Sequence, residues 1–389
     1  MAFPEGGAAA RRVLGNALSL IQADWQVTVV SGQLESESHG TNALPSALRV
    51  VSIGERDAEN LPQALKRARY VMMGRKTCEW LARQPVPPSA VILYSGYTPY
   101  LMRLMPLCHR MKVPLVFDAV EWYTAGRPAG FWVSPYLWNT EFALRVLIPR
   151  VSGVIAISSW HRDYYQKKRS VHVTLVPPTL DVEAVVPRWQ EETEDEAVMR
   201  LAYCGSASND MLDIVLEALV VLNQDSTQIL LDVAGPDETE LLKLLSLRRR
   251  GSLPAGVKVH GRLRHADSLA ITRRADFSVF LREVNRVSTA GFPTKFGESL
   301  AVGTPVITTP TSDLPRYLRD GYNGLVCSAP TTEDLISVLR RALALTAQHR
   351  LEMRRAARKT AENVFDFRHY SQSLTSLLAR VGASTNRHR

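Results

Sequence analysis

A lysine and a glutamate, Lys295 and Glu298, stand one helical turn apart in the second half of the chain. An apolar run at 277–281 precedes them and predicts a buried strand of a parallel sheet. A loop with Pro293 follows, and the next residues predict a short helix that ends at Gly303. The start of a helix beside the carboxyl end of a parallel strand favours an anion. Lys295 adds a positive charge, and the Glu298 carboxylate suits sugar hydroxyls, so the spacing predicts a nucleotide-sugar site.

This stretch resembles the donor-site signature of the family 4 (group 1) retaining glycosyltransferases of GT-B fold, which is written Glu-x7-Glu followed by Ala and by Gly-x-Pro-Val-Ile. The matching residues are Gly291, Phe292, Glu298, Ala301, Gly303, Pro305, Val306 and Ile307. The place of the first Glu holds Ala290. The chain is therefore closer to the Pro-Thr-Lys-x-x-Glu subgroup, which is common in bacterial surface polysaccharide assembly.

The resemblance implies that Glu298 binds the ribose hydroxyls and that Lys295 neutralises the leaving diphosphate. Each residue also has a plain alternative, since Glu298 would complement the helix dipole and Lys295 could be a surface lysine. The basic pair of the family is not visible in GSASNDM at 205–211, and Arg282 and Arg286 are the candidate replacements, with exposed surface arginines as the alternative. Gly291 and Thr294 are expected to offer backbone N–H groups. The predicted donor-binding residues are Gly205, Ser206, Arg282, Gly291, Phe292, Thr294, Lys295 and Glu298.

The first half of the chain carries weaker candidates. Asp118 and Glu121 follow an apolar run at a predicted strand end, where open α/β sheets place ligands. Asp118 joins Lys295 and Glu298 as a catalytic candidate, and Glu121 is a candidate for acceptor binding. Gly6 and Gly7 resemble the family's cleft-facing glycine turn, with a plain turn before a helix as the alternative. No Asp-x-Asp pair stands beside a strand end, so no metal and no cofactor are expected.

Alternating strand and helix patterns over 389 residues predict two doubly wound α/β domains. The resemblance implies the GT-B arrangement, in which two Rossmann-like domains face a central cleft. The predicted ranges are an acceptor-side domain at 1–180, an acidic linker at 181–197, a donor domain at 198–364, and a C-terminal helix with a tail at 365–389 that crosses back to the first domain. The family's first N-terminal strand is expected to be missing.

The charge is uneven, with a formal net charge of +9 and 20 Lys/Arg against 12 Asp/Glu in the first 180 residues. No nucleic-acid-binding motif accompanies this excess. The segment 61–84 is basic and amphipathic, so it predicts either contact with an anionic membrane or a core helix with a solvated basic face. No signal peptide, no bilayer-spanning run and no paired cysteine spacing is visible. We therefore expect a cytoplasmic protein, with peripheral contact at the inner face of the plasma membrane as an extension.

The family resemblance, together with these patterns, implies a metal-independent retaining glycosyltransferase of hexosyltransferase type. It would move a sugar from a nucleoside diphosphate to a lipid-linked or polysaccharide acceptor in cell-surface polysaccharide biosynthesis. Two alternatives stay open. One is a catalytically impaired GT-B subunit that binds a sugar nucleotide, and the other is a GT-B sugar-nucleotide epimerase.

Overall fold

The computed structural model describes residues 3, 7–32, 44–55, 70–95, 97–122, 135–168, 171–186, 198–207, 210–244 and 251–387. The chain divides into two compact units. The first unit comprises Met1–Thr179 and Phe367–Arg389, and the second comprises Leu180–Asp366. The last helix of the chain thus belongs to the first unit.

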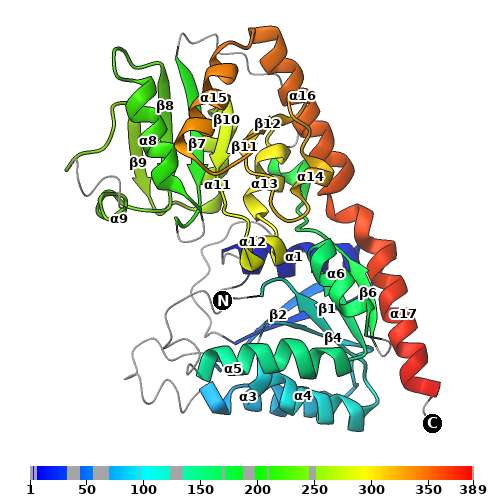
Figure 1. Cartoon of the computed structure of the whole chain (residues 1–389). Helices are drawn as coiled ribbons and strands as arrows, with labels where there is room; N and C mark the ends of the chain where they lie inside the picture. The colour runs from blue at the N-terminus through cyan, green and yellow to red at the C-terminus, as the bar shows by residue number, and fades with distance from the viewer. Residues whose placement is uncertain are drawn as a thin grey trace. The chain divides into compact units, whose positions relative to one another are not determined.

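The first unit contains two parallel sheets (Figure 1). The strands of the two sheets are β1 (Val27–Ser31) with β2 (Leu48–Ser52), and β3 (Val91–Tyr94), β4 (Leu115–Ala119), β5 (Gly153–Ala156) and β6 (His172–Leu175) in that order. The helices are α1 (Ala8–Ile21), α3 (Arg75–Ala82), α4 (Tyr97–Met111), α5 (Pro135–Phe142), α6 (Ser159–Gln166) and α17 (Ser371–Arg387), with shorter turns at Ala143–Leu147, Ile148–Arg150 and Phe367–Tyr370. Within the described ranges, no ladder joins the β1–β2 sheet to the other.

Helices cover both faces of the larger sheet, which is why its central strands are mostly apolar. Strand β4 is buried along its whole length. Val116 packs in a cluster with Leu20 of α1 and Leu377 of α17. Phe117 points to the opposite face, where its ring centroid lies 6.4 Å from that of Tyr97 on α4.

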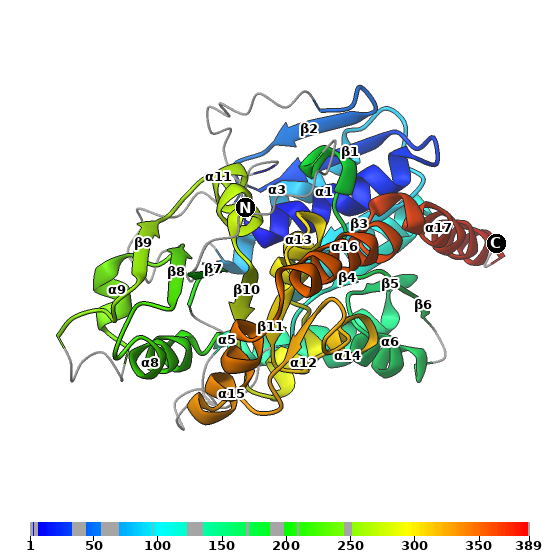
Figure 2. The same cartoon turned by 90° about the horizontal axis from the view of Figure 1, so that it is seen from above.

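The second unit is one six-stranded parallel sheet of order β12-β11-β10-β7-β8-β9. Its strands are β7 (Met199–Cys204), β8 (Ile229–Ala234), β9 (Val257–Gly261), β10 (Phe277–Phe280), β11 (Val306–Thr308) and β12 (Gly324–Val326). Its helices are α7 (Val182–Val185), α8 (Leu212–Leu222), α9 (Glu238–Leu242), α11 (His265–Arg274), α12 (Arg286–Ala290), α13 (Thr294–Ala301), α14 (Leu314–Tyr317), α15 (Thr332–Leu343) and α16 (Ala347–Val364). Figure 2 shows α8 and α15 on one face and α11, α13 and α16 on the other. The prediction of two Rossmann-like α/β domains is confirmed.

Helix α15 illustrates how the local sequence specifies an element of this unit. The Thr331 hydroxyl accepts the N–H of Asp334 and caps the first turn. The apolar residues recur with helical spacing and are buried against the sheet, namely Leu335, Val338, Leu339 and Ala342. The cap sets where the helix starts, and the apolar stripe sets which face it presents to the sheet.

Two predicted segments are described only in part. Of the predicted linker, residues 181–186 belong to the second unit and include α7, whose first turn is capped by the Asp181 side chain. Residues 187–197 lie outside the described ranges. Of the basic segment at 61–84, residues 61–69 also lie outside them.

Candidate functional site

The candidate site of the second unit lies where the chain reverses direction across the sheet. Strand β7 is the first strand of this unit, and it has β8 on one side and β10 on the other. Loops that follow two such adjacent strands leave the sheet in opposite directions, and the crevice between them is the usual ligand position in open α/β sheets. Gly205 directly follows β7, and Arg282 follows β10 by one residue.

A buried carboxylate, Asp210, gathers two cations at this point. Arg282 Nε lies 2.7 Å from Asp210 Oδ1. The Lys295 ammonium donates to the other carboxylate oxygen, Oδ2. The Tyr203 hydroxyl, which comes from β7, also lies 2.8 Å from Oδ2. The Asp210 side chain is 2% exposed and the two cations are each 15% exposed. We call Asp210, Arg282, Lys295 and Tyr203 the cation cluster.

Lys295 reaches the cluster from the first turn of α13, and its ammonium lies over the rings of Tyr203 (4.4 Å to the centroid) and Phe280 (5.4 Å). Burial lowers the pKa of Lys295, and the Asp210 carboxylate opposes that shift without reversing it. For Asp210, burial raises the pKa, but Lys295 and Arg282 together outweigh burial and hold the pKa below its usual value. The carboxylate is therefore ionised at neutral pH, and the cluster carries one carboxylate against two cationic side chains.

Two glycines make room for this arrangement. Gly205 has φ of +150°, and a Cβ placed on it would lie 2.5 Å from Lys295 Nζ. Gly235, which follows β8, has φ of +127°, and its Cβ would lie 2.1 Å from the carbonyl oxygen of Gly205. A side chain at either position would displace the lysine or the loop, because real Cβ atoms do not approach so closely. The glycines thus allow Lys295 to lie directly over the end of β7.

Glu298 lies one turn further along α13 and forms a second polar group. Its Oε1 is 3.3 Å from Nε2 of His265, the first residue of α11. The Glu298 side chain is 15% exposed and that of His265 is 39% exposed. Residues three apart on a helix share a face, so the Glu298 carboxylate and the Lys295 ammonium are neighbours. An anion held by the lysine would therefore have a hydroxyl acceptor within one helical turn.

The structure brings together some of the predicted donor residues and separates others. Gly205, Arg282, Lys295 and Glu298 gather at the site. Ser206 is exposed beside them, and Thr294 opens α13. The N–H of Gly291, by contrast, already donates to the Val287 carbonyl at 3.0 Å and closes α12, so it is not free for phosphate.

Phe292 was expected to contact the donor, but its ring is a core group. It is 6% exposed, and its centroid lies 5.9–6.2 Å from those of the other rings in an aromatic cluster, which are Phe296, Tyr317 and Phe365. Burial of these rings against one another fixes α13 on α16 and on the chain that follows α16. The motif residue therefore supports the helix that carries Lys295, and it does not itself face the site.

The predicted residues of the first unit have different surroundings. Both Asp118 oxygens are taken by the Arg12 guanidinium, at 2.9 and 3.1 Å, and Asn16 Nδ2 lies 2.9 Å from Oδ2. Asp118 is 1% exposed. This geometry favours a structural carboxylate over the predicted catalytic one. Glu121 is exposed, Gly7 is the residue before α1, and Gly6 lies outside the described ranges.

Three residues of the site were not predicted from the sequence: Tyr203, Asp210 and His265. The only sequence signal for Asp210 is a lone acid after Gly205 and Ser206, where a basic pair was sought. His161 of α6 lies outside the site, where it is fully buried and stacks between Trp122 and Tyr165, with ring centroids 6.1 Å from each.

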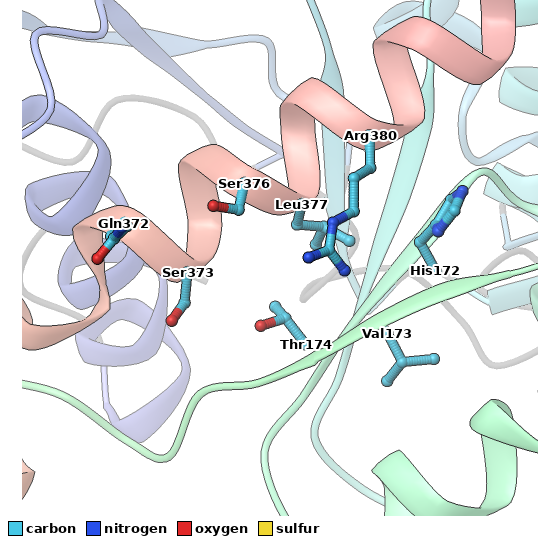
Figure 3. A pocket seen from close by; sticks show the side chains of 8 residues that line it. All are labelled: His172, Val173, Thr174, Gln372, Ser373, Ser376, Leu377 and Arg380. Carbon is cyan, nitrogen blue, oxygen red and sulfur yellow. The ribbon is translucent and has the colours of Figure 1, made fainter.

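Another cavity, of about 260 Å³, lies in the first unit between β6 and α17. Figure 3 shows Arg380 of α17 reaching toward Thr174 of β6, with Ser373 and Ser376 on the same helix. Its basic side chains, Arg380 and His172, are exposed, and no predicted site residue lines it. We assign it no role in the reaction.

Over the part of the chain that the structure describes, no side-chain group suited to a metal ion and no bilayer-spanning helix is found.

Comparisons with known proteins give one family match. Residues 201–360, which include the whole cation cluster, match the family described as Glycosyl transferases group 1. A search of curated proteins finds no match.

Solved structures match over nearly the whole chain, at low identity. Sucrose-phosphate synthase from Thermosynechococcus elongatus aligns with a TM-score of 0.70 and 15% identity, covering 96% of this chain and 93% of that one. HepE from Anabaena in complex with UDP aligns with a TM-score of 0.65 and 14% identity, covering 97% of each. WaaG, a glycosyltransferase involved in lipopolysaccharide biosynthesis, aligns with a TM-score of 0.60 and 18% identity, covering 98% and 97%. The chain has the GT-B fold, and residues 201–360 of its second unit match the group 1 glycosyltransferase family.

Proposed function

We propose that this protein is a retaining glycosyltransferase whose donor is a sugar linked to a nucleoside diphosphate. The observation that carries the proposal is the pair of cations, Lys295 and Arg282, at the ends of β7 and β10 in the unit that matches group 1 glycosyltransferases. A diphosphate leaving group gains negative charge as the glycosidic bond breaks. Fixed positive charges in a partly buried site stabilise that charge more than they would in water.

The second polar group, Glu298 with His265, would set the orientation of the nucleotide. Glu298 would accept hydrogen bonds from the ribose hydroxyls, and the diphosphate would extend from there toward Lys295. His265, 3.3 Å from Glu298, would hold the carboxylate in place. A solved structure of similar fold is described in complex with UDP and glucose, so UDP-sugars are the first donors to test.

The proposed reaction needs no protein nucleophile. The bond between the sugar C1 and the diphosphate oxygen breaks, and the acceptor oxygen bonds to C1 on the same face. The acceptor proton passes to the leaving diphosphate. Ala290, at the place of the family's first Glu, is fully buried and has no group to offer this step. Lys295 and Arg282 supply the positive charge, so the scheme includes no metal and EDTA should leave turnover unchanged.

The proposed acceptor is a lipid-linked or polysaccharide glycan, with a hexose as the transferred sugar. Peripheral contact of the first unit with an anionic membrane extends this proposal. Val71 and Met72 are 64% and 47% exposed, and Arg75 and Lys76 follow them in the chain. Apolar and basic side chains on one short segment suit a lipid interface. Cosedimentation with phosphatidylglycerol vesicles, and not with phosphatidylcholine vesicles, is the expected result.

The main test uses a panel of nucleotide sugars and the variants Lys295→Met and Glu298→Gln. Wild type should be stabilised against heat by one donor class and should transfer its sugar. We expect kcat/KM to fall about 100-fold in Lys295→Met, as when one charge-stabilising donor is removed. The loss in Glu298→Gln should be about 10- to 100-fold, as for a hydrogen bond to a charged group.

Two exposed residues of α16 provide matched controls, Lys359→Met and Glu352→Gln. Both should behave as wild type. Unchanged turnover in Lys295→Met and Glu298→Gln would contradict the assigned site. Donor binding without turnover on any acceptor would instead favour the binding-subunit alternative, and isomerised donor among the products would favour an epimerase.

A further inference from the structure

We propose that Asp210 is a positioning residue of this site, which holds Lys295 and Arg282 side by side so that their remaining N–H donors can take a diphosphate. The inference rests on the proposed function for the identity of the ligand. The arrangement of the three side chains is a property of the second unit alone.

The two carboxylate oxygens of Asp210 accept hydrogen bonds from different cations. Oδ1 accepts from Arg282, which is at the end of β10, and Oδ2 accepts from Lys295, which is on α13. Tyr203 on β7 contacts Oδ2 as well. One carboxylate thus ties together three elements that are separated by many residues in the chain. Without it, two cations would face each other in a site that is largely removed from water, and like charges so placed repel.

Both cations keep unused donors. Arg282 uses Nε for Asp210, and its two terminal nitrogens donate to no described residue. Lys295 has three N–H groups and gives one of them to Asp210. Since Asp210 is 2% exposed while each cation is 15% exposed, the anchor is buried and the cations reach toward solvent. A diphosphate can therefore bind both cations without displacing the carboxylate.

The other titratable groups around Lys295 are few. Arg282 adds a like charge from the end of β10, Cys204 lies on β7, and Glu298 with its partner His265 lies one turn along α13. Asp210 is the carboxylate that hydrogen-bonds Lys295. It supports the protonated amine against burial, so its loss should let Lys295 release its proton at lower pH.

The experiment compares Asp210→Asn with wild type in the full chain. UDP affinity is measured by calorimetry from pH 6 to 10, and the titration of Lys295 is followed by NMR with 15N at the lysine Nζ, assigned with Lys295→Met. We expect about 10-fold weaker UDP binding at pH 7. On the alkaline side, Asp210→Asn should lose its UDP affinity at a lower pH than wild type does. Lys295 should also lose its proton at a lower pH in this variant. A fall of kcat beyond the change in KM would mark misplaced cations.

Controls separate positioning from general damage. Asp232→Asn removes a half-buried carboxylate from β8 that pairs with His260, and it should change neither the UDP affinity nor its pH profile. Tyr203→Phe removes only the hydroxyl that contacts Asp210 and should shift both readouts in the same direction, by a smaller factor of about 3. It also serves if Asp210→Asn does not fold.

The outcomes are distinct. Tighter UDP binding in Asp210→Asn would overturn the proposal and make Asp210 a competitor of the diphosphate. Unchanged affinity, pH profile and Lys295 titration would overturn it as well. If wild type binds no nucleotide, the proposed function fails, but the Lys295 titration still decides whether Asp210 positions the lysine.

Discussion

Each unit of this protein holds a buried carboxylate between cationic or amide donors, and the two sites differ in how many N–H donors their cations keep for a ligand. In the first unit, Arg12 uses Nε and Nη2 on Asp118 and Nη1 on the carbonyls of Val176 and Pro177. In the second unit, Arg282 commits only Nε to Asp210. The first arrangement is closed, because every nitrogen of its guanidinium is satisfied within the unit. The second is open, because charged donors remain for a ligand.

Exposure follows the same division. Arg12 and Asp118 are 2% and 1% exposed, whereas Arg282 and Lys295 are each 15% exposed around an equally buried Asp210. A fully buried pair has lost its hydration and must be satisfied by the protein, so it reports on folding. Where the carboxylate is buried but its cations are partly exposed, an anion can still replace the water around the cations. Counting unused donors therefore separates a structural ion pair from a binding site better than the presence of charge does.

The largest effect is expected from Arg12→Met. Removing the guanidinium leaves Asp118 buried with Asn16 as its one side-chain partner among the described residues, which should cost the first unit about 3–5 kcal/mol of unfolding free energy. Six of the seven tryptophans fall within residues 1–179. Tryptophan fluorescence during urea unfolding therefore reports mainly on this unit.

The matched variant for this prediction is Lys295→Met, which should leave the same fluorescence transition nearly unchanged while it weakens UDP binding. The double variant Arg12→Met with Asp118→Leu should recover most of the lost stability, because removing both charges also removes the unpaired one. Equal destabilisation of the fluorescence transition by Arg12→Met and Lys295→Met would break the comparison between the two units.

The next effect concerns pH. His161 is fully buried among Trp122, Trp160 and Tyr165, and its ring nitrogens hydrogen-bond to no described residue. Burial lowers the pKa of His161 to about 3. The unfolded chain binds this proton near pH 6.5 and the folded chain does not, so stability falls as pH decreases from 6.5 toward 3. The slope is about 1.4 kcal/mol per pH unit for this one group.

His161→Phe keeps an aromatic ring in the stack and removes the titrating group. Between pH 6.5 and 4.5, wild type should lose about 2.3 kcal/mol more stability than this variant, measured by urea unfolding with circular dichroism. The open site of the second unit has the opposite pH dependence, since UDP binding should weaken as pH rises and Lys295 loses its proton. Parallel curves of unfolding free energy against pH for wild type and His161→Phe would show that protonation of His161 does not destabilise the folded chain.

The sequence predicts the helices and strands of both regions better than it predicts which side chains contact one another. Apolar runs predict β4 and β10, because strands covered on both faces are largely apolar. The motif spacing also placed Lys295 on a helix beside a strand end. Asp210 could not be assigned as its partner, because they are 85 residues apart and meet only through the pairing of β7 with β10.

The same limit explains two residues whose surroundings differ from expectation. The Arg12–Asp118 pair spans 106 residues and depends on how α1 lies across β4. Phe292 has a motif position, yet its surroundings come from Tyr317 and Phe365, which no local pattern connects to it. Local patterns specify helices, strands and their buried faces, whereas the neighbours of a side chain follow from the sheet order.

The smallest effect tests whether the open site depends on the close approach of Lys295 to Gly205. In Gly205→Ala, the new Cβ would lie 2.5 Å from Lys295 Nζ, and the residue would keep a φ of +150° that a side chain disfavours. We expect a stability loss of about 1–2 kcal/mol and roughly 10-fold weaker UDP binding, which corresponds to about 1.4 kcal/mol. Gly321→Ala is the control, since Gly321 also has a positive φ, +74°, but its Cβ would meet no atom within 4 Å. It should lose similar stability and bind UDP as wild type does. Equal UDP affinities in Gly205→Ala and Gly321→Ala would mean that the position of Lys295 does not limit binding, and the open site would then depend on Arg282 alone.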